Sequence, residues 1–340
     1  MSPVSLSWLG MVVASTMAAV SCAAPEVPEN AKLIPVVHDK GYQISLGGLE
    51  KLHPFDIAKY RRIHDALKGD GLLGGGNSHA PDPLSHDDLL LVHGEAYLKS
   101  LESPKKVATY LEVPQVAHLP AFLVKKGMIK PFVLASGGTL KAARLALEHG
   151  VAVNLGGGYH HAKPDSGEGF CVIADVPIAI RKLRKEGKIK RALVVDTDIH
   201  QGNGTIVCLA KDPASFTFSL HEDDIYPVPK EAGDRDVIVP AGTGDDGYLK
   251  LLEHWLPIVI RQSNPDIVFH VAGCDALVGD PLANGRMTHE GIARRDAYVV
   301  SECRKRNIPY VMTLAGGYSD GAWKAQYESI ARLMRGESRP

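Results

Sequence analysis

The 340-residue sequence predicts an α/β protein in which one parallel β-sheet is sandwiched by helices. Short apolar runs alternate with helical patterns along the chain, and the runs lack an alternating polar face, which is typical of parallel strands buried on both sides. Polar side chains follow several of the runs directly, as expected where a ligand binds at the carboxyl ends of parallel strands. A single core is normal for α/β proteins of this length, so we expect one domain over residues 31–340.

Six strands are expected, each from an apolar run of the length that strands usually have. Val, Ile, Leu and Phe, which favour extended structure, are frequent in these runs. In chain order the runs are residues 33–37, 151–155, 192–198, 215–220, 267–273 and 310–316.

The first two helices between these strands are expected from their ends. Thr139 can cap a helix that reaches His149, with Gly150 behind it, because a hydroxyl group satisfies free backbone amides and glycine ends a helix readily. The next helix covers residues 176–186, is basic on one side and stops at Gly187.

Three further helices are expected towards the end of the chain. Asp246 can open an amphipathic helix through Arg261, in which apolar residues recur on one face. Thr288 can cap a helix that reaches Arg304, and a final helix spans residues 321–334.

Two glycine-rich stretches lie outside these elements. Residues 70–87 combine Gly, Pro and polar side chains and are expected to form a surface loop. Gly156, Gly157 and Gly158 follow a strand as in nucleotide-binding loops, but neither glycine spacing typical of such loops fits the surrounding residues. Phosphate binding is therefore not expected there.

The composition is that of an ordinary globular protein. Apolar residues make up 45% of the chain, charged residues 23%, and the formal net charge is -1. Proteins that bind DNA or RNA through its phosphates usually carry a basic excess, which this chain lacks. We therefore expect no nucleic-acid partner.

Residues 1–30 differ from the rest and are expected to be a signal peptide or a lipoprotein signal. Residues 6–20 form a mostly apolar run that is too short to span a bilayer, and small residues and Cys22 follow it. This order resembles a bacterial lipoprotein processing site as well as an ordinary signal-peptidase site. We expect an exported protein, periplasmic or anchored to the membrane through a lipidated Cys22. The alternative is a disordered extension on a cytoplasmic protein, since no Lys or Arg precedes the apolar run.

The cysteines favour neither disulfides nor a thiolate zinc site. They are scattered without a C-x-x-C pair, so we expect those beyond the N-terminal segment to be small buried side chains. The five are Cys22, Cys171, Cys208, Cys274 and Cys303.

The run 192–198 leads into a histidine and carries two acids at its end. Side chains alternate along a strand, so Asp196, Asp198 and His200 are expected to project from one face as the strand ends. Carboxylate oxygens and an imidazole nitrogen together suit Zn²⁺ or a similar divalent ion. The sequence therefore predicts a metal site here.

Three other strands also end in polar groups. His160 and His161 follow one run, Asp275 follows another, and Tyr318 follows the last. Because the carboxyl ends of parallel strands meet at one edge of a sheet, these side chains are expected to converge on the same site.

Four segments resemble the zinc-dependent histone deacetylase family, whose fold is shared with arginase. The segments are GGGYHHAKPDSGEGFC (156–171), VVDTDIHQGNGT (194–205), AGCDALVGDP (272–281) and LAGGYS (314–319). The resemblance covers nearly the whole chain after residue 31. The resemblance implies an arginase/deacetylase-like fold and a hydrolase that removes acyl groups from lysine side chains.

Further details resemble the small class IV branch of that family. They are LGGLEKLHPFD at residues 46–56, the spacing HHxxxDxGxGFC, and HQGNG at 200–204 in place of HHGDG. Class IV relatives are associated with the removal of long acyl chains as well as acetyl groups.

The resemblance implies a role for each residue at the strand ends. It makes Asp198, His200 and Asp275 the ligands of one zinc ion, with a position left open for water and the substrate carbonyl; iron is the alternative metal. His161 matches the general base, and His160 matches its electrostatic partner.

Three other residues correspond to supporting groups of the family. Asp196 matches the carboxylate that supports His160. Asn203 stands where a second supporting acid is common, so His161 is expected to be less basic than in relatives that carry the acid. Tyr318 matches the donor that hydrogen-bonds the oxyanion.

The resemblance also implies a substrate tunnel and a monovalent-cation site. Phe170 matches an aromatic wall of the tunnel, with Gly169, Gly316 and Gly317 beside it. The cation site, for K⁺ or Na⁺ in a structural role, corresponds to backbone groups of Asp196, Asp198, His200, Ser219 and Leu220.

Two other functions compete with this interpretation. An arginase-like ureohydrolase needs further acids to bridge two metal ions, but residue 202 is glycine and the next acid after Asp275 is Asp280. A non-catalytic protein could bind acylated amines in the same pocket, but every group that the mechanism needs is present.

The expected partner is an acylated lysine in a peptide or protein, or a small acylated amine such as an acetylpolyamine. Residues 221–224 (His-Glu-Asp-Asp) form either an acidic rim that attracts cationic substrates or a solvated loop. If the N-terminal segment is a signal, the substrates are exported proteins, peptides or small amines rather than histones.

Overall fold

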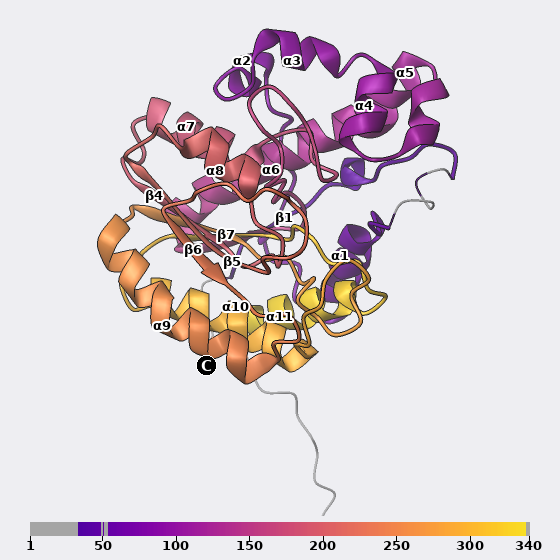
Figure 1. The fold of residues 1–340 in the computed structure, drawn as a ribbon. Helices are drawn as coiled ribbons and strands as arrows, with labels where there is room; N and C mark the ends of the chain where they lie inside the picture. Colours follow the sequence, from indigo (N-terminus) through magenta and orange to yellow (C-terminus); the bar gives the residue numbers. More distant parts are fainter. Residues whose placement is uncertain (1–32, 49, 51–53, 338–340) are drawn as a thin grey trace, which may run out of the picture. The chain divides into compact units, whose positions relative to one another are not determined.

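Eight strands form one sheet in the part of the chain that the computed structural model describes, which is residues 33–48, 50 and 54–337 (Figure 1). All pairings are parallel, and the strand order is β2-β1-β3-β8-β7-β4-β5-β6. The strands are β1 (Val36–Val37), β2 (Ser78–His79), β3 (Val151–Asn154), β4 (Ala192–Asp196), β5 (Ser215–His221), β6 (Arg235–Ile238), β7 (Ile267–Val271) and β8 (Tyr310–Thr313). The predicted α/β class with a parallel sheet is confirmed.

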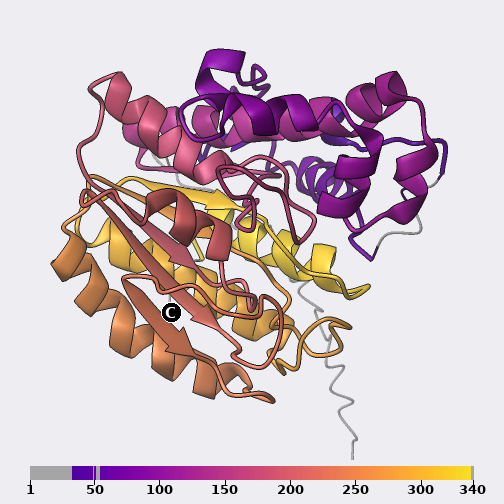
Figure 2. The same ribbon diagram turned by 45° about the horizontal axis from the view of Figure 1, so that its top comes forward.

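Helices cover both faces of this sheet (Figure 2). Helices α6 and α8 contact strands on one face, and α7 packs on both helices. Helix α9 contacts β4 and β5 on the other face, beside α10, α11 and α1. The α-helices are α1 (Lys59–Gly69), α2 (His86–Leu89), α3 (Glu95–Ser100), α4 (Pro104–Tyr110), α5 (Ala121–Val124), α6 (Lys130–His149), α7 (Asp175–Lys185), α8 (Asn203–Leu209), α9 (Asp245–Ser263), α10 (His289–Arg304) and α11 (Ala322–Arg335); η1 (Lys40–Tyr42), η3 (Pro114–His118) and η4 (Lys125–Ile129) are short helical turns of other types.

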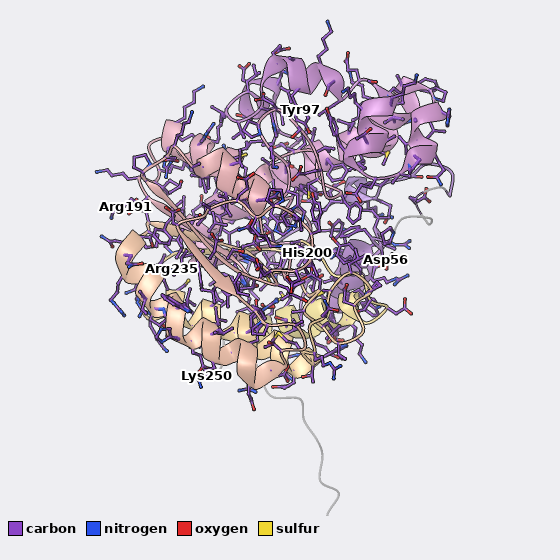
Figure 3. The ribbon with its side chains drawn as sticks, in the orientation of Figure 1. Asp56, Tyr97, Arg191, His200, Arg235 and Lys250 are labelled. Carbon is purple, nitrogen blue, oxygen red and sulfur yellow. The ribbon has the colours of Figure 1, made fainter. Side chains whose placement is uncertain are left out.

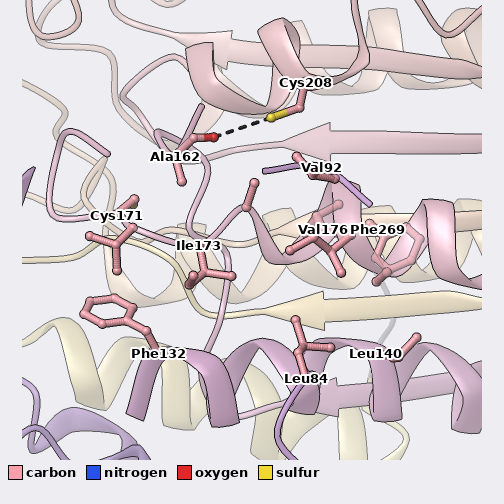
Figure 4. Close-up of a cluster of buried hydrophobic side chains, with 14 of the residues drawn as sticks. Leu84, Val92, Phe132, Leu140, Ala162, Cys171, Ile173, Val176, Cys208 and Phe269 are labelled. Atoms are coloured by element: carbon pink, nitrogen blue, oxygen red, sulfur yellow. Dashed lines mark hydrogen bonds between the residues drawn. The ribbon is translucent and has the colours of Figure 1, made fainter. Parts of the chain in front are cut away.

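Each face of the sheet has its own hydrophobic core, because successive strand residues point to opposite sides. Val194 and Phe269 belong to the core under α6 and α7, part of which Figure 4 shows. Their neighbours Leu193 and Val268 belong to the core under α9, α10 and α11. Burial on both faces explains why the strands are continuous apolar runs in the sequence.

The predicted helix start at Thr139 is wrong. Helix α6 begins nine residues earlier at Lys130, and Thr139 lies inside it, where its hydroxyl donates to Asp175 Oδ2 at 2.6 Å. The two glycines before Thr139 are residues that commonly interrupt a helix, but here they allow other parts of the chain to pack closely against α6. A Cβ atom at Gly137 would lie 1.9 Å from the Asp82 carbonyl oxygen, and one at Gly138 would lie 1.9 Å from the Tyr42 hydroxyl.

The other helix boundaries are close to those expected. Thr288 caps α10 as predicted, and its hydroxyl accepts a hydrogen bond from the Gly291 amide. Helix α9 begins one residue before Asp246, because Asp245 is already helical and its carboxylate accepts from the Thr288 amide and hydroxyl.

The stretch 70–87 is only partly the surface loop that its composition predicts. Ser78 and His79 form β2, which pairs with β1 at the sheet edge, and α2 begins at His86. Neither β2 nor β6 was expected, because both are short and lack a continuous apolar run.

Four of the five cysteines are free and buried, as predicted. Cys22 and the expected signal segment 1–30 lie outside the described residues. None of the helices that the structure describes is long and apolar enough to cross a membrane.

Candidate active site

The segment after β4 turns sharply and does not continue as a strand. β4 ends at Asp196, whose Oδ1 accepts from the Asp198 amide at 3.2 Å, and Asp198 Oδ1 in turn accepts from the His200 amide at 3.0 Å. The alternation of side chains along a strand is therefore the wrong reason for their proximity. Short polar side chains that bind the backbone two residues on produce successive turns, and these turns gather the three residues.

Asp198, His200 and Asp275 place one ligating atom each within 4.8 Å of one another, and all three are buried. His200 Nδ1 lies 3.2 Å from Asp198 Oδ1 and 2.9 Å from Asp275 Oδ2. The other ring nitrogen, Nε2, lies 3.2 Å from the Leu282 carbonyl oxygen, which can only accept, so Nδ1 is left as the ligating atom. Figure 3 labels His200, whose side chain is buried.

The chemistry of these three residues fits a divalent cation. Two carboxylates and one imidazole form the oxygen and nitrogen donor set of an open zinc site. Burial, and then the negative charge of Asp198, raise the pKa of the Asp275 carboxyl to about 7. Two buried carboxylates this close repel each other, and a bound cation removes that repulsion.

Glycine is required around the ligands because backbone passes very close to them. A Cβ atom would lie 2.0 Å from Asp198 Oδ2 at Gly273, and 2.5 Å from the same atom at Gly316. At Gly202 it would lie 2.2 Å from Asp196 Oδ2. The glycines of the GNG, AGC and AGG segments thus allow this close approach of backbone to the carboxylates.

His160 and His161 lie side by side beyond β3, with ring centroids 4.0 Å apart. His160 Nδ1 contacts Asp196 Oδ2 at 2.8 Å, and His161 Nδ1 contacts Asn203 Oδ1 at 2.8 Å. The structure therefore pairs each histidine with the partner that the resemblance implies.

The two partners give the histidines opposite electrostatic properties. Burial acts to lower the pKa of His160, but the carboxylates of Asp196 and Asp198 outweigh it and raise the pKa to about 9. Burial, and then the charge of His160, hold the pKa of His161 well below its usual value, and the neutral amide of Asn203 opposes this only in part. One imidazolium and one neutral imidazole therefore stand together.

Tyr318 lies on the turn after β8, and its ring centroid is 6.2 Å from that of His200. The turn is fixed at two points: the Tyr318 amide donates to Asp280 Oδ2 at 2.7 Å, and the Gly316 amide donates to Asp198 Oδ2 at 2.9 Å. Burial, and then the charges of Asp198 and Asp275, raise the pKa of the Tyr318 phenol well above its usual value. The hydroxyl therefore stays protonated and can donate.

A pocket lies beside these residues and is lined by the expected catalytic residues His160, His161 and Tyr318. Three of the four expected substrate-binding residues, Gly169, Phe170 and Gly316, also line it. Gly317 instead packs against Cys274, because a Cβ atom there would lie 2.3 Å from the sulfur. The Phe170 ring meets the Tyr318 ring edge to face, with centroids 5.9 Å apart.

Residues named for the cation site and the acidic rim are placed as follows. Ser219 of β5 is the register partner of Asp196 of β4, so the backbone segments of the expected cation site adjoin. His221 and Glu222 are buried, and Glu222 binds Asn284, which leaves Asp223 and Asp224 as the exposed acids.

The structure gives no support to a second metal beside the first. Both oxygens of Asp280 accept backbone amides, from Tyr318 and Leu282. Among the residues that the structure describes, one group of three side chains has the spacing of a metal site.

Lys59 is a site residue that no sequence pattern predicted. It is 1% exposed, and its Nζ donates to the carbonyl oxygens of Ala315 at 2.7 Å and Gly316 at 3.0 Å. The ammonium group also lies over the Phe55 ring, 4.5 Å from the centroid. Lysine at the start of an amphipathic helix is usually solvated, so the neighbouring HPFD motif is the one signal that could have indicated this role.

Replacement of Lys59 by methionine is expected to lower kcat about tenfold, because the carbonyls of the tyrosine turn lose their donors and the turn loosens. The KM of an acyl-lysine peptide is expected to change little. Steady-state kinetics of Lys59→Met beside Lys68→Met, an exposed lysine of the same helix, tests this. Equal kcat in the two variants would show that the turn holds its position without Lys59.

Comparison with known proteins places the chain among related sequences. Residues 53–334 match the family described as histone deacetylase domain. The chain is 39% identical over 305 residues to histone deacetylase 2 of Arabidopsis thaliana, covering 89% of this chain and 79% of the relative. It is 36% identical to an uncharacterized protein of Picosynechococcus sp., covering 84% and 92%, and 28% identical to a probable deacetylase of Archaeoglobus fulgidus, covering 84% and 82%.

The architecture is also found in a solved structure. The crystal structure of the HDA15 HD domain superimposes with a TM-score of 0.71, covering 89% of this chain and 91% of that chain. The two sequences are 23% identical, so this likeness concerns the fold alone.

Proposed function

This chain belongs to the histone deacetylase family, and we propose that it is a zinc-dependent hydrolase that removes acetyl or longer acyl groups from lysine side chains. One observation carries the proposal. The three metal-ligating side chains lie together, and the rings of His161 and Tyr318, whose centroids lie 6.3 and 6.2 Å from that of the ligand His200, line a largely apolar pocket.

Asp198, His200 and Asp275 would hold the metal ion through two carboxylate oxygens and Nδ1 of the imidazole. When bound, zinc polarises the scissile carbonyl and makes a water molecule acidic enough to supply hydroxide near neutral pH. Their burial keeps bulk water from competing for the ion.

His161 acts as the general base in this proposal. Its Nδ1 proton is held by Asn203 Oδ1, which leaves the Nε2 lone pair to take a proton from the attacking water. The low pKa of His161 means that it is neutral and ready to accept before the reaction. The same nitrogen then returns the proton to the leaving amine.

His160 remains protonated beside it. The Asp196 carboxylate keeps the proton on His160, and the resulting positive charge stabilises the negative charge that develops on the substrate. The two rings thus divide the work, and their titration belongs to the pair.

Tyr318 donates its phenol proton in a hydrogen bond to the oxygen of the tetrahedral intermediate. Two hydrogen bonds hold the turn that carries Tyr318, and the phenol pKa, raised well above its usual value, keeps the hydroxyl protonated as a donor.

The class IV branch is part of the proposal. It is supported by the motif at residues 46–56, by the spacing after the two histidines, and by Asn203 in the HQGNG segment. The contact between Asn203 and His161 gives this branch marker a physical meaning, since the base has an amide rather than a carboxylate behind it.

The apolar lining of the pocket favours substrates whose acyl groups are longer than acetyl. Ile44, Leu46, Leu111, Val113, Met128 and Phe132 line it, whereas an acetyl group needs room for one methyl group. Each methylene that such a surface removes from water contributes about 0.8 kcal/mol to binding. Small acylated amines such as acetylpolyamines are the alternative substrates, because they carry the same amide.

The experiment that tests the proposal is steady-state kinetics of the full chain with acetyl-, crotonyl- and myristoyl-lysine peptides and acetylated polyamines. Activity is expected to fall in step with zinc content during chelation and to return when one equivalent of Zn²⁺ is added; parallel additions of Fe²⁺ decide which metal supports the higher rate. Hydrolysis that survives complete metal removal would refute the zinc mechanism.

Narrowing the pocket at Val113 is expected to discriminate against long acyl chains. If Val113→Phe excludes two methylenes from the apolar wall, kcat/KM for the myristoyl-lysine peptide falls roughly 15-fold, because the loss is about 1.6 kcal/mol. The rate with the acetyl-lysine peptide serves as the internal control and is expected to stay near the wild-type value. An equal fall in kcat/KM with both peptides would mean that the long acyl group does not bind against Val113.

Export remains a proposal that rests on the sequence of residues 1–30. Fractionation of cells that express Cys22→Ala beside wild type tests the lipid anchor. A membrane pool in wild type that disappears in the variant is expected if Cys22 is lipidated, and a pool that persists would exclude lipidation as the anchor.

A further inference from the structure

The side-chain amide of Asn203 has two unequal ends, an oxygen and a nitrogen, whereas a carboxylate would present two oxygens. With Oδ1 towards His161, the amide accepts a hydrogen bond from Nδ1–H. With Nδ2 towards it, the amide would donate a hydrogen bond to Nδ1, and the ring proton would have to be on Nε2. Only the first orientation leaves Nε2 with a lone pair. Something must therefore fix the orientation of this amide.

Glu168 contacts the other end of the same amide. Asn203 Nδ2 donates to Glu168 Oε1 at 2.5 Å, and Asn203 itself is 2% exposed. An ionised carboxylate only accepts hydrogen bonds, so rotation of the amide would bring two oxygens together and leave the buried Nδ2 facing His161. The contact with Glu168 favours the orientation in which Oδ1 faces the histidine.

A cation and the Asn203 amide hold the Glu168 side chain. Lys163 Nζ lies 3.1 Å from its Oε1, the same oxygen that accepts from Asn203 Nδ2. The Tyr226 ring meets the His161 ring edge to face, with centroids 4.9 Å apart. The carboxylate is thus part of one cluster with the base.

The backbone around Glu168 is built to place it there. Glu168 and Cys171 exchange two backbone hydrogen bonds, of 3.1 and 2.9 Å, and the two residues between them have positive φ angles. Gly169 at the tip passes between two rings: a Cβ atom there would lie 2.5 Å from the His161 ring and 2.9 Å from the Tyr226 ring. The same segment of chain therefore carries both the base and the carboxylate.

We propose that Glu168 is a positioning residue for His161: by accepting from Asn203 Nδ2 it fixes the amide, and the amide fixes the imidazole tautomer with its proton on Nδ1. The inference rests on the proposed role of His161 as the base. An acid at position 203 would contact the His161 ring directly. In this chain Glu168 supplies the carboxylate instead, and it acts on the ring through the Asn203 amide.

The first test is Glu168→Gln in the full chain. Glutamine can present either its oxygen or its nitrogen to Asn203, so the orientation is no longer fixed. We expect kcat with an acetyl-lysine peptide to fall about 10- to 100-fold while KM changes little, because Glu168 does not line the pocket. Glu231→Gln is the matched control, since Glu231 is the other carboxylate that pairs with Lys163. The proposal is overturned if both variants keep wild-type kcat.

The second test asks whether the effect passes through Asn203. An aspartate at 203 has two oxygens and no orientation to choose, and a glutamine at position 168 can donate to it. We expect Glu168→Gln combined with Asn203→Asp to recover most of the lost kcat, and Asn203→Asp alone to be less active than the pair because two carboxylates then face each other. A double variant no better than Glu168→Gln would show that Glu168 has only a structural role.

The third readout needs no turnover. Long-range ¹H–¹⁵N spectra of the full chain labelled at histidine report which ring nitrogen carries the proton, with the His161 signal assigned by its loss in His161→Gln. We expect the Nδ1–H tautomer in wild type, with or without zinc, and a mixture in Glu168→Gln. An unchanged tautomer would overturn the proposal. An inactive wild-type protein would refute the proposed function alone, since the tautomer is read independently.

Discussion

The variant His161→Ala is expected to lose at least about 100-fold in kcat, because general-base catalysis by a positioned side chain contributes at least that much. The structure provides no substitute. His160 lies closest, but its proton is held by Asp196 and its pKa is raised to about 9, so it is charged and cannot accept a proton near neutral pH. The KM of the peptide is expected to change less than kcat.

Kinetics alone would not separate loss of the base from loss of the metal or the fold. His161 is not one of the three ligating side chains, so zinc content per chain is expected to equal that of wild type in the variant. His118→Ala removes an exposed imidazole and is expected to leave kcat unchanged. Near-normal turnover in His161→Ala with full zinc content would contradict the proposed mechanism.

The variant Tyr318→Phe is expected to lower kcat at least about 100-fold, as the removal of one oxyanion donor does in other hydrolases. The phenyl ring keeps the contacts with Phe55 and Phe170, whose centroids lie 6.1 and 5.9 Å from that of Tyr318, so the pocket retains its shape. The variant loses only the Tyr318 hydroxyl, which in wild type stays protonated because the pKa of the phenol is raised.

Loss of the Tyr318 hydroxyl is not expected to weaken substrate binding before the reaction. The Tyr318 hydroxyl acts on charge that exists only as the carbonyl is attacked, so kcat is expected to fall while KM stays near the wild-type value. Tyr298→Phe, which removes a hydroxyl from the surface of α10, is the matched control. A large rise in KM with unchanged kcat would mean that Tyr318 binds the ground state and does not stabilise the oxyanion.

The sequence predicted the fold from signals that are local and repeated. Each buried parallel strand is an apolar run, and the polar groups that follow Leu155, Asp196 and Val271 gather at one edge because parallel strands end on the same side. The short strands β2 and β6 escaped prediction because a pair or a quartet of residues carries too little periodicity.

The parts of the site that escaped prediction depend on partners distant in the chain or on backbone atoms. Lys59 binds two carbonyl oxygens more than 250 positions away, and carbonyl oxygens leave no trace in a sequence. Glu168 looks like one more polar residue in a turn until Asn203 is placed beside it. The choice of Nδ1 in His200 depends on the Leu282 carbonyl, which no motif records.

The order of strands in the sheet has a consequence for how the protein is made. β3, which leads to the two histidines, pairs on one side with β8, a strand that is synthesised about 150 residues later. The side chains that follow β4 likewise need β7, which pairs with β4, and Asp275, which accepts a hydrogen bond from the Ile199 amide. A nascent fragment that ends before Asp275 lacks one of the three clustered side chains, and one that ends before Tyr318 lacks the phenol. The candidate site therefore cannot assemble during synthesis until the segment that follows β8 has been made.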